Sequence, residues 1–512
     1  MIEEEKDKLN SSLRLIAKSS FVVLIFILFS KILTYVYRII IARQFGPEEY
    51  GLFSLAVMIL GWFVAVFSFG LVDGIIRYVS LYRGKKEINK IHYIIKITTT
   101  FLLFSGISSC ILLFILSEYI SLNLFHNPDL IVYLKWFSIS IPFFIFASTF
   151  LSILQAFEKI NWYSFIRNVL DISVKLIAIL IFISLGFKTN AIIFSYILGI
   201  LSMLLFSYYL VKVKLSEVFM KYTLEKKLKK RIVKDLFSYS WPLMFLSVVA
   251  FIFSWVDSFA IGYFKNVTDV GIYNAAVPLA SLLIIVPSLF IQLFFPMITK
   301  EFSRNKISLI KDISKQVAKW IFLLNLPLLI IMILFPGAII NLFFGPEYLS
   351  AAWALRFLSI GTFFYSIFII SANLLSMAGR SKTVLFNILV SSIINLILNI
   401  LLVPKYGISG AAFSTMITYI IWSFISLIQA KRSVSIVPIK RKMLTILLIS
   451  LIPAFLLVYI KQFIPVNNLS LILQGVLFFL LYLFLVICFR GLDKNDYMII
   501  NTIKEKFYKK GI

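Results

Sequence analysis

The sequence predicts an all-α protein that crosses a membrane about fourteen times. Of its 512 residues, 61% are hydrophobic and only 14% are charged, and a soluble chain of this length has no means of hiding so much apolar surface. The hydrophobic residues form separate runs of roughly 20 or more, which is the length that a helix needs to span a bilayer. The basic residues gather between alternate runs, as the positive-inside rule describes for multi-pass proteins.

The runs fall into two groups on either side of a charged stretch. The first half contains six predicted spans, at about 20–41, 52–74, 93–116, 130–156, 162–185 and 190–211. The second half contains eight, at about 237–263, 270–297, 316–336, 349–377, 383–403, 408–430, 443–462 and 469–489. Between them, the segment 212–235 carries nine Lys or Arg residues. We therefore predict four parts, which are an N-terminal lobe at 1–211, a basic connector at 212–235, a C-terminal lobe at 236–430, and two further helices with a tail at 431–512.

The basic loops also predict an orientation. With fourteen spans, the N-terminal arm, the loop at 83–90, the connector and the C-terminal tail all fall on one side, while the opposite loops hold only scattered basic residues such as Arg43 and Lys461. Positive-inside bias then places both termini and the connector in the cytoplasm, in a plasma membrane. The formal net charge of +27 indicates orientation and contact with anionic membrane lipids, not nucleic acid binding.

The two halves share a short repeat. Ile41 lies ten residues before Gly51, and Ile261 lies ten before Gly271, so the two passages match at a shift of 220 residues. Six spans is an even number, so the two lobes would have the same orientation and be related by an axis along the membrane normal. This parallel repeat is a plan found in transporters, and the last two helices lie outside it.

Charges inside the spans are the candidate functional residues, because they are costly in a bilayer. Lys31 and Arg38 share one face of the first helix, and Arg167, Asp171 and Lys175 follow helical spacing in the fifth span. We expect the four cations to line a shared space. An internal ion pair for Lys31 and a salt-bridge ladder in the fifth span remain alternatives.

Other charges are secondary candidates. Arg77 lies near the cytoplasmic interface, where a substrate would enter, and Arg356 lies toward the outer side of the second half. For Asp257 two alternatives stay open. It is a structural partner of Arg356 or of a polar neighbour, or it serves, like Asp171, in ion coupling or charge balance. Several cations around one space favour an anionic substrate such as a diphosphate, for which Lys and Arg supply charge and hydrogen-bond donors.

The residues do not indicate an enzyme or a cofactor. The two histidines are isolated, and Cys110 and Cys488 lie far apart in apolar segments, so neither a zinc cluster nor a disulfide is expected. The outer loops 117–129 and 337–348 are short and nearly uncharged, which argues against a catalytic membrane glycosyltransferase. No Gly-rich loop with Lys is present to bind a nucleotide.

Several passages resemble one known family in their order and spacing. The chain contains FSKILTYVYRIIIARQFGPEEYGLFSLA near its start, GIYNAAVPLA and FGPEYLSAAWALRFLSIG later, and NLILNILLVPKYGISGAAFSTMITYII toward its end. These resemble the polysaccharide biosynthesis protein family of Wzx-type oligosaccharide flippases, in the multidrug/oligosaccharidyl-lipid/polysaccharide exporter superfamily. The resemblance implies a flippase that turns a polyprenyl- or dolichyl-linked oligosaccharide from the cytoplasmic to the outer leaflet by alternating access, with other polysaccharide-assembly proteins as further partners.

Two alternatives stay open at this stage. A multidrug-type cation antiporter of the same superfamily would be expected to have twelve spans and acidic cavity residues, whereas this sequence predicts fourteen spans and a basic cavity. A membrane glycosyltransferase or polymerase would show sugar transfer in purified protein that is lost when one carboxylate is mutated.

Overall fold

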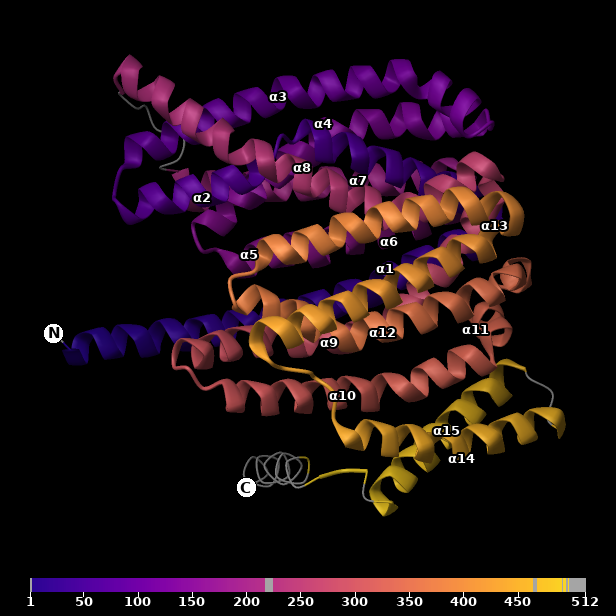
Figure 1. Ribbon diagram of the computed structural model, residues 1–512. Coiled ribbons are helices and arrows are strands. Elements are labelled where there is room, and N and C mark those ends of the chain that lie inside the picture. Colours follow the sequence, from indigo (N-terminus) through magenta and orange to yellow (C-terminus); the bar gives the residue numbers. More distant parts are fainter. Residues whose placement is uncertain (1, 217–223, 464–466, 490, 494–495, 497–512) are drawn as a thin grey trace, which may run out of the picture. The chain divides into compact units, whose positions relative to one another are not determined.

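The computed structural model describes residues 2–216, 224–463, 467–489, 491–493 and 496. Part of the predicted connector and most of the C-terminal tail therefore lie outside the described residues. Within the described ranges all regular structure is helical (Figure 1). The chain forms two compact units, Met1–Asn274 and Ala275–Ile512, and the four-part division expected from the sequence stays a prediction.

The first unit holds the helices of the first half, the next span and the start of a further one. They are α1 (Ile2–Phe67), α2 (Leu71–Gly84), α3 (Ile88–Tyr119), α4 (Asp129–Ala156), α5 (Ile160–Phe165), α6 (Asp171–Ser184), α7 (Asn190–Lys214), α8 (Lys226–Phe264) and the first turns of α9 (Val267–Ser303). A π-helical turn, Ile166–Leu170, joins α5 to α6.

The second unit begins within α9. It contains α10 (Ile307–Leu334), α11 (Pro336–Phe343), α12 (Ala352–Met377), α13 (Ser381–Val434), α14 (Arg441–Phe463) and α15 (Asn468–Cys488). Here α12 packs along α13, and the α14–α15 hairpin packs against α10.

The helices account for the predicted spans. Eleven of the described helical segments are long and apolar enough to cross a membrane. Two of these, α1 and α13, are each two helices joined across a kink, at Gly46 and Gly407. A further span is formed by α5, the π-helical turn and α6, which together cover the predicted segment 162–185. Each of the fourteen predicted spans is thus matched by helical structure, and the all-α polytopic class is confirmed.

The second predicted span, 52–74, differs from the expectation because it is broken. α1 ends at Phe67 and α2 begins at Leu71. Between them Phe69 and Gly70 have positive φ angles of 50° and 65°, which ends a right-handed helix. A Cβ at Gly70 would lie only 2.3 Å from the carbonyl oxygen of Ser240 on α8. The break therefore lets another helix approach the backbone, which hydropathy does not reveal.

Two glycines of the sequence repeat pack reciprocally in the first unit. A Cβ at Gly51 would lie 1.9 Å from the carbonyl oxygen of Val267, and a Cβ at Gly271 would lie 1.9 Å from the carbonyl oxygen of Pro47. Pro47 and Val267 are separated by the same 220 residues as the two glycines. Equivalent positions around a two-fold axis make such reciprocal contacts, and the contact therefore agrees with the parallel repeat.

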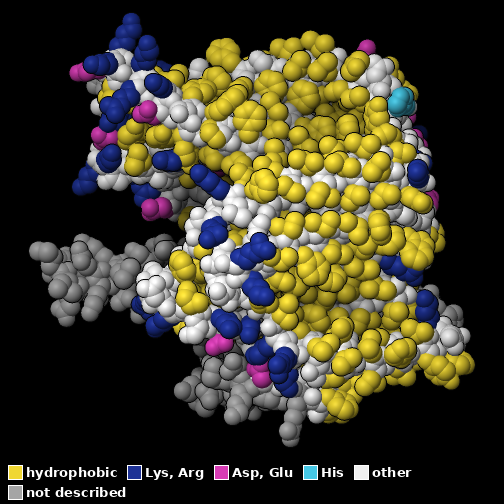
Figure 2. All heavy atoms as spheres, viewed as in Figure 1, with side chains coloured by type: hydrophobic (Ala, Val, Ile, Leu, Met, Phe, Trp, Pro, Cys, Tyr) yellow, Lys and Arg dark blue, Asp and Glu magenta, His cyan; other side chains and the backbone are white. Residues whose placement is uncertain are grey.

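The surface of each unit is that of a membrane protein. On the face shown in Figure 2, hydrophobic side chains cover the middle of the helices, and Lys and Arg gather mainly near the helix ends. Large apolar side chains such as Phe104, Phe455 and Leu469 are mostly exposed, at 66%, 72% and 68%. Such a surface requires lipid around it.

Candidate functional site

The densest cluster of predicted site residues in the first unit surrounds Tyr196 on α7. The Nζ of Lys175, on α6, lies 4.0 Å from the centroid of the Tyr196 ring and donates a hydrogen bond to Asp171 Oδ2 at 2.9 Å. Arg38, on α1, also interacts electrostatically with Tyr196. The structure thus brings cations from α1 and α6 to one aromatic side chain.

Close packing of aromatic rings and of small residues builds this cluster. The ring of Phe137 on α4 stacks on Tyr196 at 4.8 Å between centroids, and the Tyr37 hydroxyl lies 3.1 Å from Ser195 Oγ. A Cβ at Gly199 would lie 2.4 Å from Lys175 Cγ. The glycine one turn beyond Tyr196 therefore leaves the space that the lysine side chain fills.

Lys175 is an internal residue. It is 7% exposed, and the Asp171 carboxylate and the Tyr196 ring face its ammonium group, two contacts that stabilise a buried cation. Asp171 Oδ1 is buried and accepts no hydrogen bond from the described residues. The structure therefore gives Lys175 a partner within the unit and leaves one carboxylate oxygen with acceptor capacity.

Lys31 and Arg38 occupy a more open position on α1. Lys31 is exposed and Arg38 half-buried, and the two side chains interact electrostatically. Arg38 donates a hydrogen bond to the hydroxyl of Tyr50. Tyr50 lies beyond the kink in the same helix, and its hydroxyl donates to the carbonyl oxygen of Asn274 at 3.2 Å. The kink therefore lets a second part of α1 orient the guanidinium.

Arg167 has different surroundings from Lys175, with which helical spacing predicts a shared face. Arg167 is exposed, donates to the Tyr163 hydroxyl at 3.3 Å and interacts electrostatically with Asp73. It sits in the π-helical turn Ile166–Leu170. Arg167 and Lys175 therefore differ in exposure and in partners, since Arg167 is exposed and Lys175 is buried.

Arg77 and Asp257 lie where α8 packs against its neighbours. The guanidinium of Arg77, on α2, lies 4.1 Å from the centroid of the Tyr239 ring on α8. Asp257, on α8, accepts a hydrogen bond from the Tyr273 hydroxyl on α9 at 2.5 Å. Arg356 belongs to the second unit, where it lines a pocket at the end of α10.

The second unit also holds an ionic cluster that the sequence analysis missed. Lys319 on α10 is completely buried. It forms ion pairs with Asp493, at 2.9 Å, and with Asp496. Lys440 also pairs with Asp493, at 2.5 Å, and Trp320 Nε1 donates to Asp496 at 2.8 Å. These contacts fasten the segment after α15 to the middle of α10 and to Lys440, just before α14, and we call them the C-terminal clamp.

The lysines of the C-terminal clamp stabilise the ionised form of Asp493. Burial alone would raise the pKa of Asp493, but hydrogen bonds from Lys440 and Lys319 outweigh burial and hold that pKa well below its usual range. Two features of the sequence could have revealed the C-terminal clamp. Lys319 is a charge inside the predicted span 316–336, and Asp493 and Asp496 are acids in a basic tail.

The fold defines the class of protein first. A lipid II flippase, MurJ, solved in an inward closed conformation, superposes with a TM-score of 0.72 at 21% identity, covering 92% of this chain and 99% of that one. A multidrug resistance MATE transporter in an inward-facing conformation gives a TM-score of 0.67 at 13% identity, covering 79% and 94%. The chain therefore shares the fold of these two membrane proteins.

The family is shown by the sequence. The family described as polysaccharide biosynthesis protein matches residues 16–302, more than half of the chain. The chain therefore belongs to the polysaccharide biosynthesis protein family, and the expected family is confirmed. The MatE family also matches residues 242–401.

Relatives come from archaea and bacteria. An uncharacterized membrane protein of Methanocaldococcus jannaschii is 27% identical over 472 residues, covering 88% of this chain and 91% of the relative. A Shigella flexneri protein named as an O-antigen transporter is 26% identical over 396 residues, covering 74% and 89%. A Haloferax volcanii protein named as a low-salt glycan biosynthesis flippase is 25% identical over 299 residues, covering 58% and 61%.

Proposed function

We propose that this protein moves a lipid-linked oligosaccharide from the cytoplasmic to the outer leaflet of the plasma membrane by alternating access. The oligosaccharide is joined through a diphosphate to a polyprenyl or dolichyl carrier. Family membership and relatives named as an O-antigen transporter and a glycan flippase support the proposal. The observation that carries it is the pair of membrane-embedded cations on α1, of which Lys31 is exposed and Arg38 half-buried.

The residues have distinct roles in this proposal. Lys31 and Arg38 bind the diphosphate, since a phosphate group satisfies both their charge and their hydrogen-bond donors where water is scarce. Arg77 and Arg167 attract the headgroup as it enters. Lys175 holds the wall of the site together through its contacts with Asp171 and Tyr196.

Two carboxylates are candidates for ion coupling. Asp171 has an oxygen with acceptor capacity beside the cation cluster. Asp257 bridges α8 to α9 through Tyr273, so a change in its protonation would act on the contact between two helices. An ion gradient, the membrane potential or downhill substrate supplies the energy, because the sequence has no nucleotide-binding loop.

The reciprocal glycine contact supports alternating access. It joins equivalent positions of the two repeats, Gly51 and Gly271, at the helix ends predicted to lie outside. A contact between equivalent helices can open symmetrically without rearranging each lobe. We propose that it closes the outer side in this conformation and separates when substrate leaves.

A multidrug-type cation antiporter is the second candidate, favoured by the MatE match and the similar MATE structures. It would bind organic cations, for which an exposed lysine on α1 is unfavourable. A membrane glycosyltransferase or polymerase is the third candidate, and it would require catalysis. Sugar transfer by the purified protein would favour this third candidate over transport.

Leaflet accessibility in proteoliposomes tests the function. A fluorescent polyprenyl-diphosphate disaccharide is reconstituted with the protein, and its exposure to a membrane-impermeant quencher is followed. Lys31→Gln and Arg38→Gln should each lower the flipping rate more than tenfold, because an unmatched phosphate charge costs roughly 2–5 kcal/mol. The control is Lys405→Gln, an exposed lysine near the α13 kink, which should flip at the normal rate.

The same assay separates binding from structure. Lys175→Gln should lower the yield of folded protein, because it leaves the half-buried Asp171 carboxylate without its cation, and adding Asp171→Asn should restore the yield. Normal flipping by both α1 variants would refute the proposed site. Export of an organic cation with no flipping by the native protein would refute the proposed function.

A further inference from the structure

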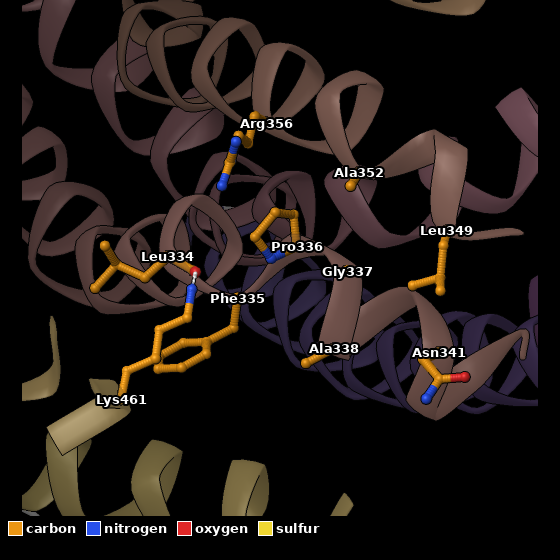
Figure 3. A pocket seen from close by; sticks show the side chains of 10 residues that line it. All are labelled: Leu334, Phe335, Pro336, Gly337, Ala338, Asn341, Leu349, Ala352, Arg356 and Lys461. Atoms are coloured by element: carbon orange, nitrogen blue, oxygen red, sulfur yellow. Dashed lines mark hydrogen bonds between the residues drawn. The ribbon is translucent and has the colours of Figure 1, made fainter. Parts of the chain in front are cut away.

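A pocket in the second unit carries two cations and no acidic residue among its described lining residues. It lies where α10 ends and α11 begins and has a volume of about 370 Å³ (Figure 3). Cavities of about 300 Å³ and larger hold small ligands or headgroups. The two cations are Arg356 from α12 and Lys461 from α14.

The end of α10 holds both cations in place. Arg356 Nε donates to the carbonyl oxygen of Ile333 at 3.0 Å, and Lys461 Nζ donates to that of Leu334 at 3.0 Å. Figure 3 shows the two side chains reaching this helix end from different sides. The ring of Trp353 also lies 4.5 Å from Arg356 Cζ. Two consecutive carbonyls at the end of α10 therefore each hold one cation at this pocket.

These contacts leave the positive charge largely uncompensated. The C-terminal end of a helix carries roughly half a negative charge. The two side chains bring two full positive charges, so the end of α10 compensates only part of them. Gly337 and Ala338, in the first turn of α11, also line the pocket, and the first amides of a helix have no partner within that helix. Each cation has further N–H donors besides the one it uses.

We propose that this pocket binds the phosphate group of an anionic lipid. Two large apolar side chains lie exposed beside it, namely Leu349, which lines it and is 45% exposed, and Trp353, which packs on Arg356 and is 56% exposed. They supply a surface for acyl chains, and Trp and Tyr are the residues enriched where a membrane meets water. A free phosphate would use the two cations but would gain nothing from this apolar rim.

The inference goes beyond the proposed function because it assigns Arg356 to a resident lipid and not to the transported diphosphate. It requires only that this end of the second unit lies at the membrane surface. The outer leaflet is the location only under the proposed orientation. A bound lipid here would hold α12 and α14 together through α10.

Lipid titration of the delipidated full-length protein tests the proposal. Binding of dioctanoyl phosphatidylglycerol, dioctanoyl phosphatidylcholine and inorganic phosphate is measured separately by native mass spectrometry. We expect the native protein to prefer phosphatidylglycerol. Because each basic residue near an anionic lipid contributes roughly fivefold in affinity, Arg356→Gln with Lys461→Gln should weaken that binding about thirtyfold.

Two further variants keep the test decisive. Lys461→Gln alone changes an exposed side chain, so this variant should stay folded and bind phosphatidylglycerol roughly fivefold more weakly. Lys461→Arg keeps the charge and should retain binding. Lys405→Gln is the matched control and should bind like the native protein. Equal phosphatidylglycerol binding by the native and double-variant proteins would overturn the site. Equal affinity for inorganic phosphate would overturn its assignment to a lipid. Neither result bears on flipping.

Discussion

Adding one methyl group at Gly51 should open the contact between the two repeats. In the present conformation that Cβ would lie 1.9 Å from the carbonyl oxygen of Val267 and 3.0 Å from the backbone nitrogen of Gly271. Non-bonded carbon and oxygen atoms do not approach within about 3 Å, so the helices must separate by roughly 1 Å. The obstacle is backbone, which no side-chain rotation relieves.

The free-energy cost of Gly51→Ala in the closed conformation is that of overpacking a close contact. Forcing an extra methyl group into a packed contact costs roughly 1–3 kcal/mol, which would reduce the closed population about fivefold to more than a hundredfold. Alanine also stabilises a helix by about 1 kcal/mol relative to glycine, so this effect on helix stability must be distinguished from the steric clash. Gly84→Ala provides the control, because a Cβ at Gly84 meets nothing within 4 Å.

Thiol labelling measures the opening. Ser54→Cys, one turn beyond Gly51 and 3% exposed, is introduced after Cys110 and Cys488 have been replaced. A membrane-impermeant maleimide should label it faster in Gly51→Ala, with no change in Gly84→Ala. Gly271→Ala should have the same effect, and the double variant should add little, because one separation relieves both clashes. Equal labelling of the Gly51 and Gly84 variants, or fully additive effects, would refute this reasoning.

Two other predictions concern the C-terminal clamp and the orientation. Lys319→Met should lower the free energy of unfolding by about 3–5 kcal/mol, because it leaves the buried Asp496 without its cation. The expected readouts are a lower melting temperature and faster proteolysis after α15, and an unchanged protein would contradict the prediction. The pKa of Asp493 is lower in the folded than in the unfolded protein. The stabilisation that its carboxylate gives the folded state is therefore complete above the ordinary pKa of an aspartate, about 3.9, and is lost only as the pH falls below this value. Proteolysis at pH 5 and pH 8 should therefore be equal, and release at pH 5 would count against the clamp. Cysteines placed within 221–231 should react only from the cytoplasm and those within 121–128 only from outside; the reverse would invert the proposed orientation.

The sequence alone determined the class, the number of spans and the family. Bilayer thickness sets a length that each helix must meet by itself, so hydropathy identifies the spans one at a time. The repeat at a shift of 220 residues was also visible in the sequence. The same local view missed the break at Gly70, because its cause is the approach of a distant helix.

Only the tertiary structure decided which charges have partners. Lys175 was expected in an open space, but it is buried beside Asp171 and Tyr196, whereas Arg167 is exposed. Lys319 pairs with Asp493, 174 residues away. Helical spacing tells which side chains share a face, whereas packing between helices determines what that face meets. Contact of Lys31, Arg38, Arg77, Arg167 and Arg356 with a ligand therefore stays a prediction, because a charge inside a span shows that a partner is needed and only the assembled helices determine whether the protein or a ligand provides it.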